Sequence, residues 1–322
     1  MVNMQNPILQ KYLKALTHVK RGGTKYGMAP HKPVLLITLI ELIQKEIVVD
    51  NRFEVNADLV GVFQENWRLL VQTANQPDFT QPFYYLQSDR AEGQAFWFLK
   101  PKQGCQINVH IKSVNRLAEG LDHGALADDL SVLLTDTINR EIILQTLLET
   151  YFPHSKTIYL QAKQEGRGYY HELEEYVLNE PEVRIRKVKI ETEEDVFVRG
   201  GLFKRYIPQI YQSTCAFTGM RLSSTFGHSF IDACHIIPFS VDHDDKVTNG
   251  IALCPNMHRA FDRGLLSISS EYKVLVSSHV YEDKEHAYSL SRLKDKPIAL
   301  PQSKQYWPCT ENLEWHRINV FR

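Results

Sequence analysis

Two histidines and an asparagine in the last third of the chain have the residue types that hydrolysis of a phosphodiester requires. His235 lies in the segment ACHIIP, Asn249 in VTNG and His258 in CPNMHRAF. A neutral imidazole near pH 7 is suited to take a proton from water. An imidazole can also bind the divalent cation that stabilises charge on the phosphate, and an amide side chain can fix the orientation of a ring. The three residues therefore predict metal-dependent phosphodiester hydrolysis.

The surrounding residues predict the elements that position these side chains. ACHIIP is typical of a strand end, VTNG of a turn before the strand IALC, and CPNMHRAF of the start of a helix. Residues 197–213 predict a helix that leads into this segment, and LLSISSEYKVLVSS predicts a hairpin after it. Strand, strand and helix in this order form a ββα finger that carries His, Asn and His.

The same segment resembles the HNH nucleases, a ββα-metal family, and in particular the branch found in bacterial modification-dependent restriction enzymes. The matches are HIIP, NG, LCPNMH and FDRGL, within a resemblance that covers roughly residues 197–322. This resemblance implies His235 as the general base, Asn249 as the residue that orients it and His258 as a metal ligand. It also implies one divalent cation, such as Mg²⁺, Mn²⁺, Co²⁺ or Ni²⁺.

The sequence departs from the family pattern at two places that involve cysteine. Many members carry Asp or His immediately before the base, where this chain has Cys234, a ligand that favours ions softer than Mg²⁺. Either Cys234 packs in the core and the metal is held more openly, or Asp232 replaces it as a ligand. In a regular strand Asp232 points to the opposite face from His235. Zinc-stabilised members carry two CxxC pairs, of which only Cys215 and Cys254 remain, so no structural zinc is expected.

The N-terminal part resembles the sulfur-recognising domain of phosphorothioate-dependent restriction enzymes. KRGGTKYGMAPHKPVLLITLIELI, PFYYL and FWFL carry this resemblance, which covers residues 1–153. It implies Pro82 in an apolar pocket for sulfur, with His31 and Lys32 as a basic pair on the DNA. An apolar pocket tolerates sulfur but leaves the hydrogen-bonding capacity of an oxygen unmet. Members of the family often have Tyr at the position of Gln81 and Arg at the position of Lys32. Lysine cannot make the bidentate contact with guanine that arginine makes.

Positive charge is concentrated near the N-terminus, although the whole chain has a net charge of −1. Residues 1–40 contain no Asp or Glu, and their cations include Arg21 and Lys25, which are candidates for contact with DNA. Arg259 directly follows His258 and is a candidate for contact with the scissile phosphate. The alternative for the basic residues of 1–40 is that they lie on solvated helix or strand faces.

The predicted elements indicate an α+β chain with two domains joined by a connector. Helices are expected over residues 8–20, from Pro33 onward, over 57–75 and over 138–150, and strands over 82–86 and 95–99. The expected domains are a DNA-reading domain over 1–153, a connector with some structure over 154–196 and a nuclease domain over 197–322.

Composition indicates an intracellular protein. The five cysteines are an odd number and are widely spaced, which argues against a disulfide framework and for a reducing, cytoplasmic location. No apolar run reaches the roughly 18 residues of a membrane span, and the N-terminus has no signal-peptide pattern. A membrane partner is therefore not expected.

The leading hypothesis is a phosphorothioate-sensing restriction endonuclease that acts on double-stranded DNA. A double-strand cut by one finger per chain suggests two chains acting together as a homodimer. The first alternative keeps the nuclease but has it read another modification or an unmodified sequence. The second alternative, from a different class, is a DNA-binding module whose finger does not cut.

Overall fold

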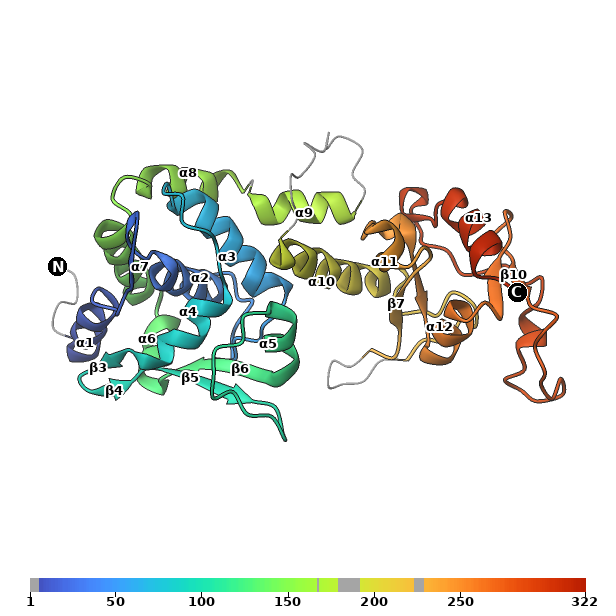
Figure 1. Cartoon of the computed structure of the whole chain (residues 1–322), viewed down its shortest axis with the longest axis horizontal. Helices are drawn as coiled ribbons and strands as arrows, with labels where there is room; N and C mark the ends of the chain where they lie inside the picture. Colours follow the sequence, from blue (N-terminus) through green and yellow to red (C-terminus); the bar gives the residue numbers. More distant parts are fainter. Residues whose placement is uncertain (1–5, 167, 179–191, 223–228) are drawn as a thin grey trace. The chain divides into compact units, whose positions relative to one another are not determined.

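The chain forms two compact units, which are described separately below. The computed structural model describes residues 6–166, 168–178, 192–222 and 229–322 (Figure 1). One unit comprises Met1–Glu172 and Val188–Val198, and the other Leu173–Lys187 and Arg199–Arg322. The connector expected over 154–196 is thus divided between the two units, and its residues 179–191 lie outside the described residues. Helices and strands are mixed, as expected. Within the described residues, no helix has the length and apolarity needed to cross a membrane.

The helices of the first unit pack around one apolar helix, α2 (His31–Gln44). Every residue of α2 from Lys32 to Leu42 is buried, as expected for a helix that is apolar on all sides. It contacts α3, α4, α6 and α7. The other helices of this unit are α1 (Pro7–Leu16), α3 (Ala57–Leu70), α4 (Thr80–Tyr85), α5 (Val114–Gly120), α6 (Asp128–Thr135), α7 (Thr137–Tyr151) and α8 (Lys156–Glu165).

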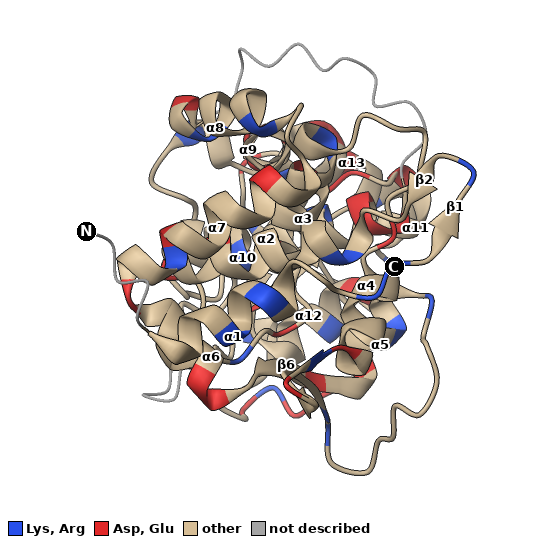
Figure 2. Ribbon diagram, turned by 90° about the vertical axis from the view of Figure 1, so that its left-hand side faces the viewer, with Lys and Arg blue, Asp and Glu red and all other residues tan. Residues whose placement is uncertain are grey.

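Three short antiparallel strand pairs lie among the described residues of the first unit. They are β1 (Gly23–Thr24) with β2 (Gly27–Met28), β3 (Arg90–Ala91) with β4 (Gln94–Ala95), and β5 (Trp97–Pro101) with β6 (Leu121–Leu126). The segment FWFL, expected as a strand, lies largely in β5. The turn between β1 and β2 carries Lys25, and Figure 2 shows a basic residue at this turn.

The prediction of a strand over 82–86 is wrong, because PFYYL belongs to α4 and the 3₁₀ turn η1 (Leu86–Ser88). The carboxylate of Asp78 caps this helix by accepting hydrogen bonds from the Gln81 backbone N–H at 3.1 Å and from the Thr80 hydroxyl at 2.8 Å. Pro82 lies in the first turn, where its missing N–H costs no helical hydrogen bond. The aromatic content of the segment favoured a strand, but capping and the burial of Phe83 favour a helix.

The second unit contains the expected ββα finger. Strand β7 (Asp232–His235) pairs with β8 (Gly250–Leu253) in an antiparallel register that sets His235 opposite Gly250. Two helices, α9 (Tyr169–Val177) and α10 (Glu193–Ile210), begin in the first unit and end in the second. The other elements of the second unit are α11 (Phe239–Asp242), η2 (Val247–Asn249), α12 (Pro255–Asp262), β9 (Leu266–Ile268), β10 (Val274–Val276), η3 (Leu290–Leu293), η4 (Lys304–Tyr306) and α13 (Thr310–Asn319).

Both ends of α12, the helix of the finger, are defined by local sequence. Pro255 occupies its first turn, where proline is preorganised for a helix. Gly264 follows the helix with a φ of 71°, in the left-handed region that favours glycine. A Cβ atom at Gly264 would lie 2.0 Å from the Val320 carbonyl oxygen. Glycine is therefore needed both for the turn and for the close approach of the C-terminal segment.

Candidate active site

His235 lies at the end of β7 and is held from two sides. Its ring stacks on Phe203 of α10, with 3.9 Å between centroids and 9° between the planes. Its Nε2 lies 3.0 Å from Oδ1 of Asp245. Asp245 is only 1 % exposed, whereas the His235 side chain remains 22 % exposed. The ring is thus fixed by packing and by a buried carboxylate, yet it keeps access to solvent.

Gly250 makes room for the stacking partner of His235. It lies opposite His235 in the β7–β8 register. A Cβ atom at this position would lie 2.7 Å from the Phe203 ring and 2.3 Å from the Ile207 side chain. The glycine of the NG motif therefore allows α10 to pack closely against the hairpin.

Asn249 was expected to orient the imidazole of His235. Its side chain bonds to the backbone of the loop beside the hairpin and not to the imidazole. It is fully buried. Its amide nitrogen donates to the carbonyl oxygens of Ile237 and Asp244, both at 3.0 Å, and its oxygen accepts from the Ile237 N–H at 2.9 Å. A further bond comes from the side-chain amide of Asn312. The side chain thus links the backbone on both sides of α11 and holds the carbonyl group of Asp244, next to the His235 partner Asp245.

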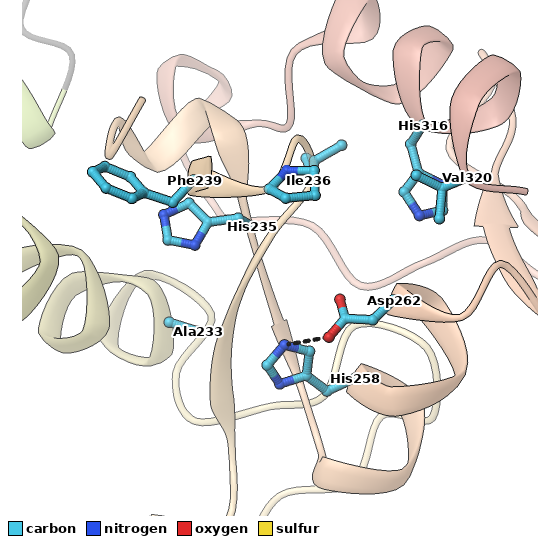
Figure 3. Close-up of a pocket in the computed structure, with 9 residues that line it drawn as sticks. Ala233, His235, Ile236, Phe239, His258, Asp262, His316 and Val320 are labelled. Atoms are coloured by element: carbon cyan, nitrogen blue, oxygen red, sulfur yellow. Dashed lines mark ion pairs between the residues drawn. The ribbon is translucent and has the colours of Figure 1, made fainter. Parts of the chain in front are cut away.

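His258 belongs to a cluster of three potential metal ligands. One ligand atom each from Cys234, His258 and Asp262 lies within 4.8 Å of the others. His258 and Asp262 are one turn apart on α12, with 3.4 Å between Nε2 and Oδ2 (Figure 3). The Cys234 thiol lies 3.6 Å from Oδ1 of Asp262. Strand β7 and helix α12 together position this donor set.

Asp232 lies on the other ring nitrogen of His258. Its Oδ2 is 3.3 Å from Nδ1 of His258, and it is not a member of the three-residue cluster. A histidine that binds a metal commonly donates its second N–H to a carboxylate, which fixes the ring orientation. Asp232 has the position of such an orienting partner.

The donor set is compatible with a divalent cation. Imidazole, thiolate and carboxylate all bind first-row transition metals, and a thiolate selects the softer ones. Burial raises the pKa of the Cys234 thiol well above its usual value, and the carboxylates of Asp262 and Asp232 raise it further. Binding of a cation through this sulfur would release the thiol proton.

His235 and His258 line one cavity of about 280 Å³, although they come from different elements. Figure 3 shows His235 and Phe239 on one side of this cavity and His258 with Asp262 on another. The full lining is Ala233, His235, Ile236, Pro238, Phe239, His258, Asp262, His316 and Val320. The structure thus brings the predicted base and the predicted ligand to a shared space.

Another histidine in this cavity is structural. His316 of α13 stacks on Phe261, with 3.7 Å between ring centroids. Its Nδ1 lies 2.9 Å from the Ser267 hydroxyl oxygen, and its Nε2 lies 3.3 Å from the Phe261 carbonyl oxygen. Burial lowers its pKa to about 4. His316 is therefore a neutral packing residue at neutral pH.

Three other residues of the second unit were singled out from the sequence. Arg259 lies on α12 and is not among the residues that line the cavity. Cys215 and Cys254 are buried, free thiols. Small apolar core positions are the usual environment of such cysteines.

Three site residues were missed at the level of sequence. Asp262 follows His258 by four residues. In the predicted helix this spacing places the two side chains next to each other, so it could have identified Asp262 as a neighbour of the predicted ligand His258. Asp245 has the sequence context of a solvated acidic loop, because nothing local distinguishes it from Asp242 and Asp244. Phe203 lies 32 residues before His235, in the upstream part of the family resemblance, and no role was predicted for it. Its contact depends on tertiary packing alone.

The first unit has a separate cavity of about 320 Å³ that collects most of the predicted DNA-binding residues. Arg21, His31, Lys32 and Pro82 all line it, whereas Lys25 is exposed on the β1–β2 turn. The remaining lining residues are Lys20, Gly22, Ala29, Gln81, Tyr85 and Ser88.

The predicted basic pair in this cavity does not supply two free cations. Lys32 is 8 % exposed and forms an ion pair with buried Asp89, which also accepts a hydrogen bond from the Lys20 backbone N–H. Burial lowers the pKa of His31, whose Nε2 bonds to the Gln76 carbonyl oxygen at 3.0 Å. Lys20 and Arg21 at the rim therefore carry most of the positive charge that this cavity offers.

Comparisons with known proteins match the segment that carries His235, Asn249 and His258. Residues 215–269 match the family model "HNH_2: HNH endonuclease". The chain is 32% identical over 84 residues to the type IV methyl-directed restriction enzyme EcoKMcrA of Escherichia coli (strain K12), a match that covers 26% of this chain and 30% of that protein. A solved structure of the modification-dependent TagI restriction endonuclease matches with a TM-score of 0.31 and 22% identity, over 38% of this chain and 39% of that one. The chain therefore carries at residues 215–269 an HNH endonuclease domain that is homologous to modification-dependent restriction enzymes.

Proposed function

We propose that this protein is a divalent-metal-dependent DNA endonuclease of the modification-dependent restriction type. The observation that carries the proposal is the shared cavity, in which His235 lies opposite the His258–Asp262 pair. One group that can take a proton and one set that can hold a cation are thus available to the same phosphodiester. The domain match and the methyl-directed relative support DNA as the substrate.

Each side chain then has a defined task. His235 takes the proton of the attacking water, whose oxygen forms a bond to phosphorus while the bond to the leaving sugar oxygen breaks. The leaving oxygen keeps that electron pair and takes a proton from solvent. Cys234, His258 and Asp262 would hold the cation, and Asp232 would orient His258. The bound cation supplies charge stabilisation at the phosphate.

The mark that we propose for the first unit is a phosphorothioate. Its cavity combines Ala29, Pro82 and Tyr85 with a lysine whose ammonium is already engaged by Asp89. Such a wall offers less hydrogen bonding to a phosphate oxygen and suits the larger, less well solvated sulfur atom. Lys20, Arg21 and Lys25 would contact the neighbouring phosphates. The substrate would be double-stranded DNA in the cytoplasm, cut on both strands by two copies of the chain.

Cleavage of matched plasmids tests both parts of this proposal. Plasmids of one sequence, with and without phosphorothioate links, are incubated with the protein and with Mg²⁺, Mn²⁺, Co²⁺ or Ni²⁺. We expect cutting of the modified plasmid, loss of cutting for His235→Ala with DNA binding retained, and normal cutting for the control His279→Ala, which changes an exposed histidine of the same unit that does not line the cavity.

Other outcomes separate the alternatives. Equal cutting of both plasmids would reject sulfur recognition and keep the nuclease. Cutting that requires methylated DNA would replace the sulfur mark by methylation, in keeping with the methyl-directed E. coli relative. Binding without cutting in any of the four metals would reject the catalytic role and leave a DNA-binding module.

A further inference from the structure

Two buried charged side chains lie behind the ring of His235 and form a chain of three with it. Nε2 of His235 is 3.0 Å from Oδ1 of Asp245. Oδ2 of the same carboxylate faces Nη2 of Arg199 at 3.9 Å. Asp245 is 1 % and Arg199 is 5 % exposed. Neither residue is one of the His, Asn and His of the motif, and neither lines the cavity.

We propose that Asp245 is a positioning residue that sets the tautomer of the base His235; the inference rests on the nuclease function proposed above. A carboxylate only accepts hydrogen bonds, so a neutral imidazole that bonds to it must carry its proton on Nε2. Nδ1 is then the unprotonated nitrogen, and it is the atom that takes the proton of water. The imidazolium formed in this step lies against the carboxylate, which stabilises it.

The surroundings leave the ring little freedom to adopt another arrangement. Phe203 stacks on one face of His235 at 3.9 Å between centroids, which fixes the plane of the ring. Asn249 bonds to the carbonyl oxygen of Asp244, which fixes the backbone next to Asp245. This explains how a buried asparagine that does not contact the imidazole can still control it, because it holds the residue that does.

Arg199 makes the role of Asp245 testable with a single substitution. In Asp245→Asn the amide can turn either its oxygen or its nitrogen toward His235. The guanidinium of Arg199 attracts the oxygen, so the amide nitrogen is directed to His235 and donates to Nε2. His235 must then carry its proton on Nδ1, which removes the base while the shape of the site is retained.

The experiment compares Asp245→Asn with Asp242→Asn, the same chemical change at an exposed position three residues earlier. Single-turnover cleavage, DNA affinity, Mn²⁺ affinity and melting temperature are measured for each variant. The tautomer of His235 is read from long-range ¹H–¹⁵N spectra of the full chain labelled at histidine, with His235→Gln used to assign its signals.

We expect Asp245→Asn to lower the cleavage rate by roughly 10³- to 10⁴-fold, the size of the effect when a carboxylate that orients a catalytic imidazole becomes an amide. DNA and Mn²⁺ affinity should stay within about twofold, and the His235 signal should change from the Nε2–H to the Nδ1–H form. Asp242→Asn should change none of these quantities.

Two results would overturn the inference. One is an Nδ1–H tautomer of His235 in the unsubstituted protein, a measurement that does not depend on cleavage or on the folding of any variant. The other is an Asp245→Asn variant that cuts within threefold of the unsubstituted rate, or one that loses DNA affinity together with cleavage. If the unsubstituted protein does not cut DNA at all, the proposed function fails, while the tautomer still tests the Asp245–His235 pairing.

Discussion

Nε2 of His258 lies 3.4 Å from Oδ2 of Asp262, one turn further along α12. Together with the Cys234 sulfur, these atoms are close enough to bind one cation. Asp232 bonds to the opposite nitrogen of the same ring at 3.3 Å. We therefore expect the two aspartates that flank His258 to have different roles, Asp262 as a ligand and Asp232 as an orienting partner, and substitution distinguishes them.

Asp262→Ala should weaken metal binding more than Asp232→Ala. Loss of an outer partner of a metal-binding histidine costs roughly 10- to 100-fold in affinity, and loss of a ligand should cost more. Titration calorimetry with Mn²⁺ measures both affinities. Asp242→Ala serves as the control for removal of an exposed carboxylate of the same unit, and equal affinities for Asp262→Ala and this control would remove Asp262 from the ligand set.

Cys234→Ser should change which metal works best. The thiolate favours softer ions, whereas a hydroxyl does not. We expect the affinities for Co²⁺ and Ni²⁺ to fall by about tenfold or more, with a smaller change for Mg²⁺. Cleavage rates in each metal, compared with those of Cys215→Ser, provide the measurement and its control, since Cys215 is also buried but lies outside the cluster. A uniform loss in all three metals would indicate a packing role for Cys234.

The first unit should lose stability when the buried ion pair between Lys32, which lines its cavity, and Asp89 is broken. Asp89→Asn leaves Lys32 buried without its carboxylate, and removal of one partner of a buried pair typically costs about 3–5 kcal/mol. Lys32 keeps some exposure, so we expect the lower part of this range. Urea unfolding measures the change. Asp50→Asn, at an exposed ion pair with Arg52, should cost less than about 1 kcal/mol.

The second unit should lose stability as the pH falls below 6.5. His316 has a pKa of about 4 in the folded chain, against an ordinary histidine value of 6.5. The unfolded chain therefore binds a proton first, so the contribution of His316 is complete above pH 6.5 and is lost progressively down to about pH 4. The slope from this group approaches roughly 1.4 kcal/mol per pH unit.

Urea unfolding of the unsubstituted chain and of His316→Gln, at several pH values between 4.5 and 7.5, isolates this contribution. The variant should be less stable at pH 7.5, because it loses the stacking on Phe261, but its stability should fall less steeply with pH. Parallel curves for the two proteins would show that protonation of His316 is not what destabilises the second unit in acid.

Local sequence determined much of the finger. His235, Asn249 and His258 lie within 24 residues, and the strand, turn and helix that carry them follow from hydrophobic pattern, the NG turn and Pro255. These signals are local, because the periodicity of a strand or helix and the geometry of a turn depend on neighbouring residues. The central helix after Pro33 was predictable for the same reason.

Only tertiary structure decided which partners these residues have. Asp245 is indistinguishable in sequence from the acids beside it, and Arg199 and Phe203 of α10 lie more than 30 residues before His235 in the chain. Lys32 looked like a free cation until the fold placed Asp89, 57 residues later, beside it. PFYYL favoured a strand by composition, but the Asp78 cap and core packing made it α4. Burial and pairing of charges depend on how distant segments meet, and for that reason the chemical groups were predictable while their ionisation, orientation and partners were not.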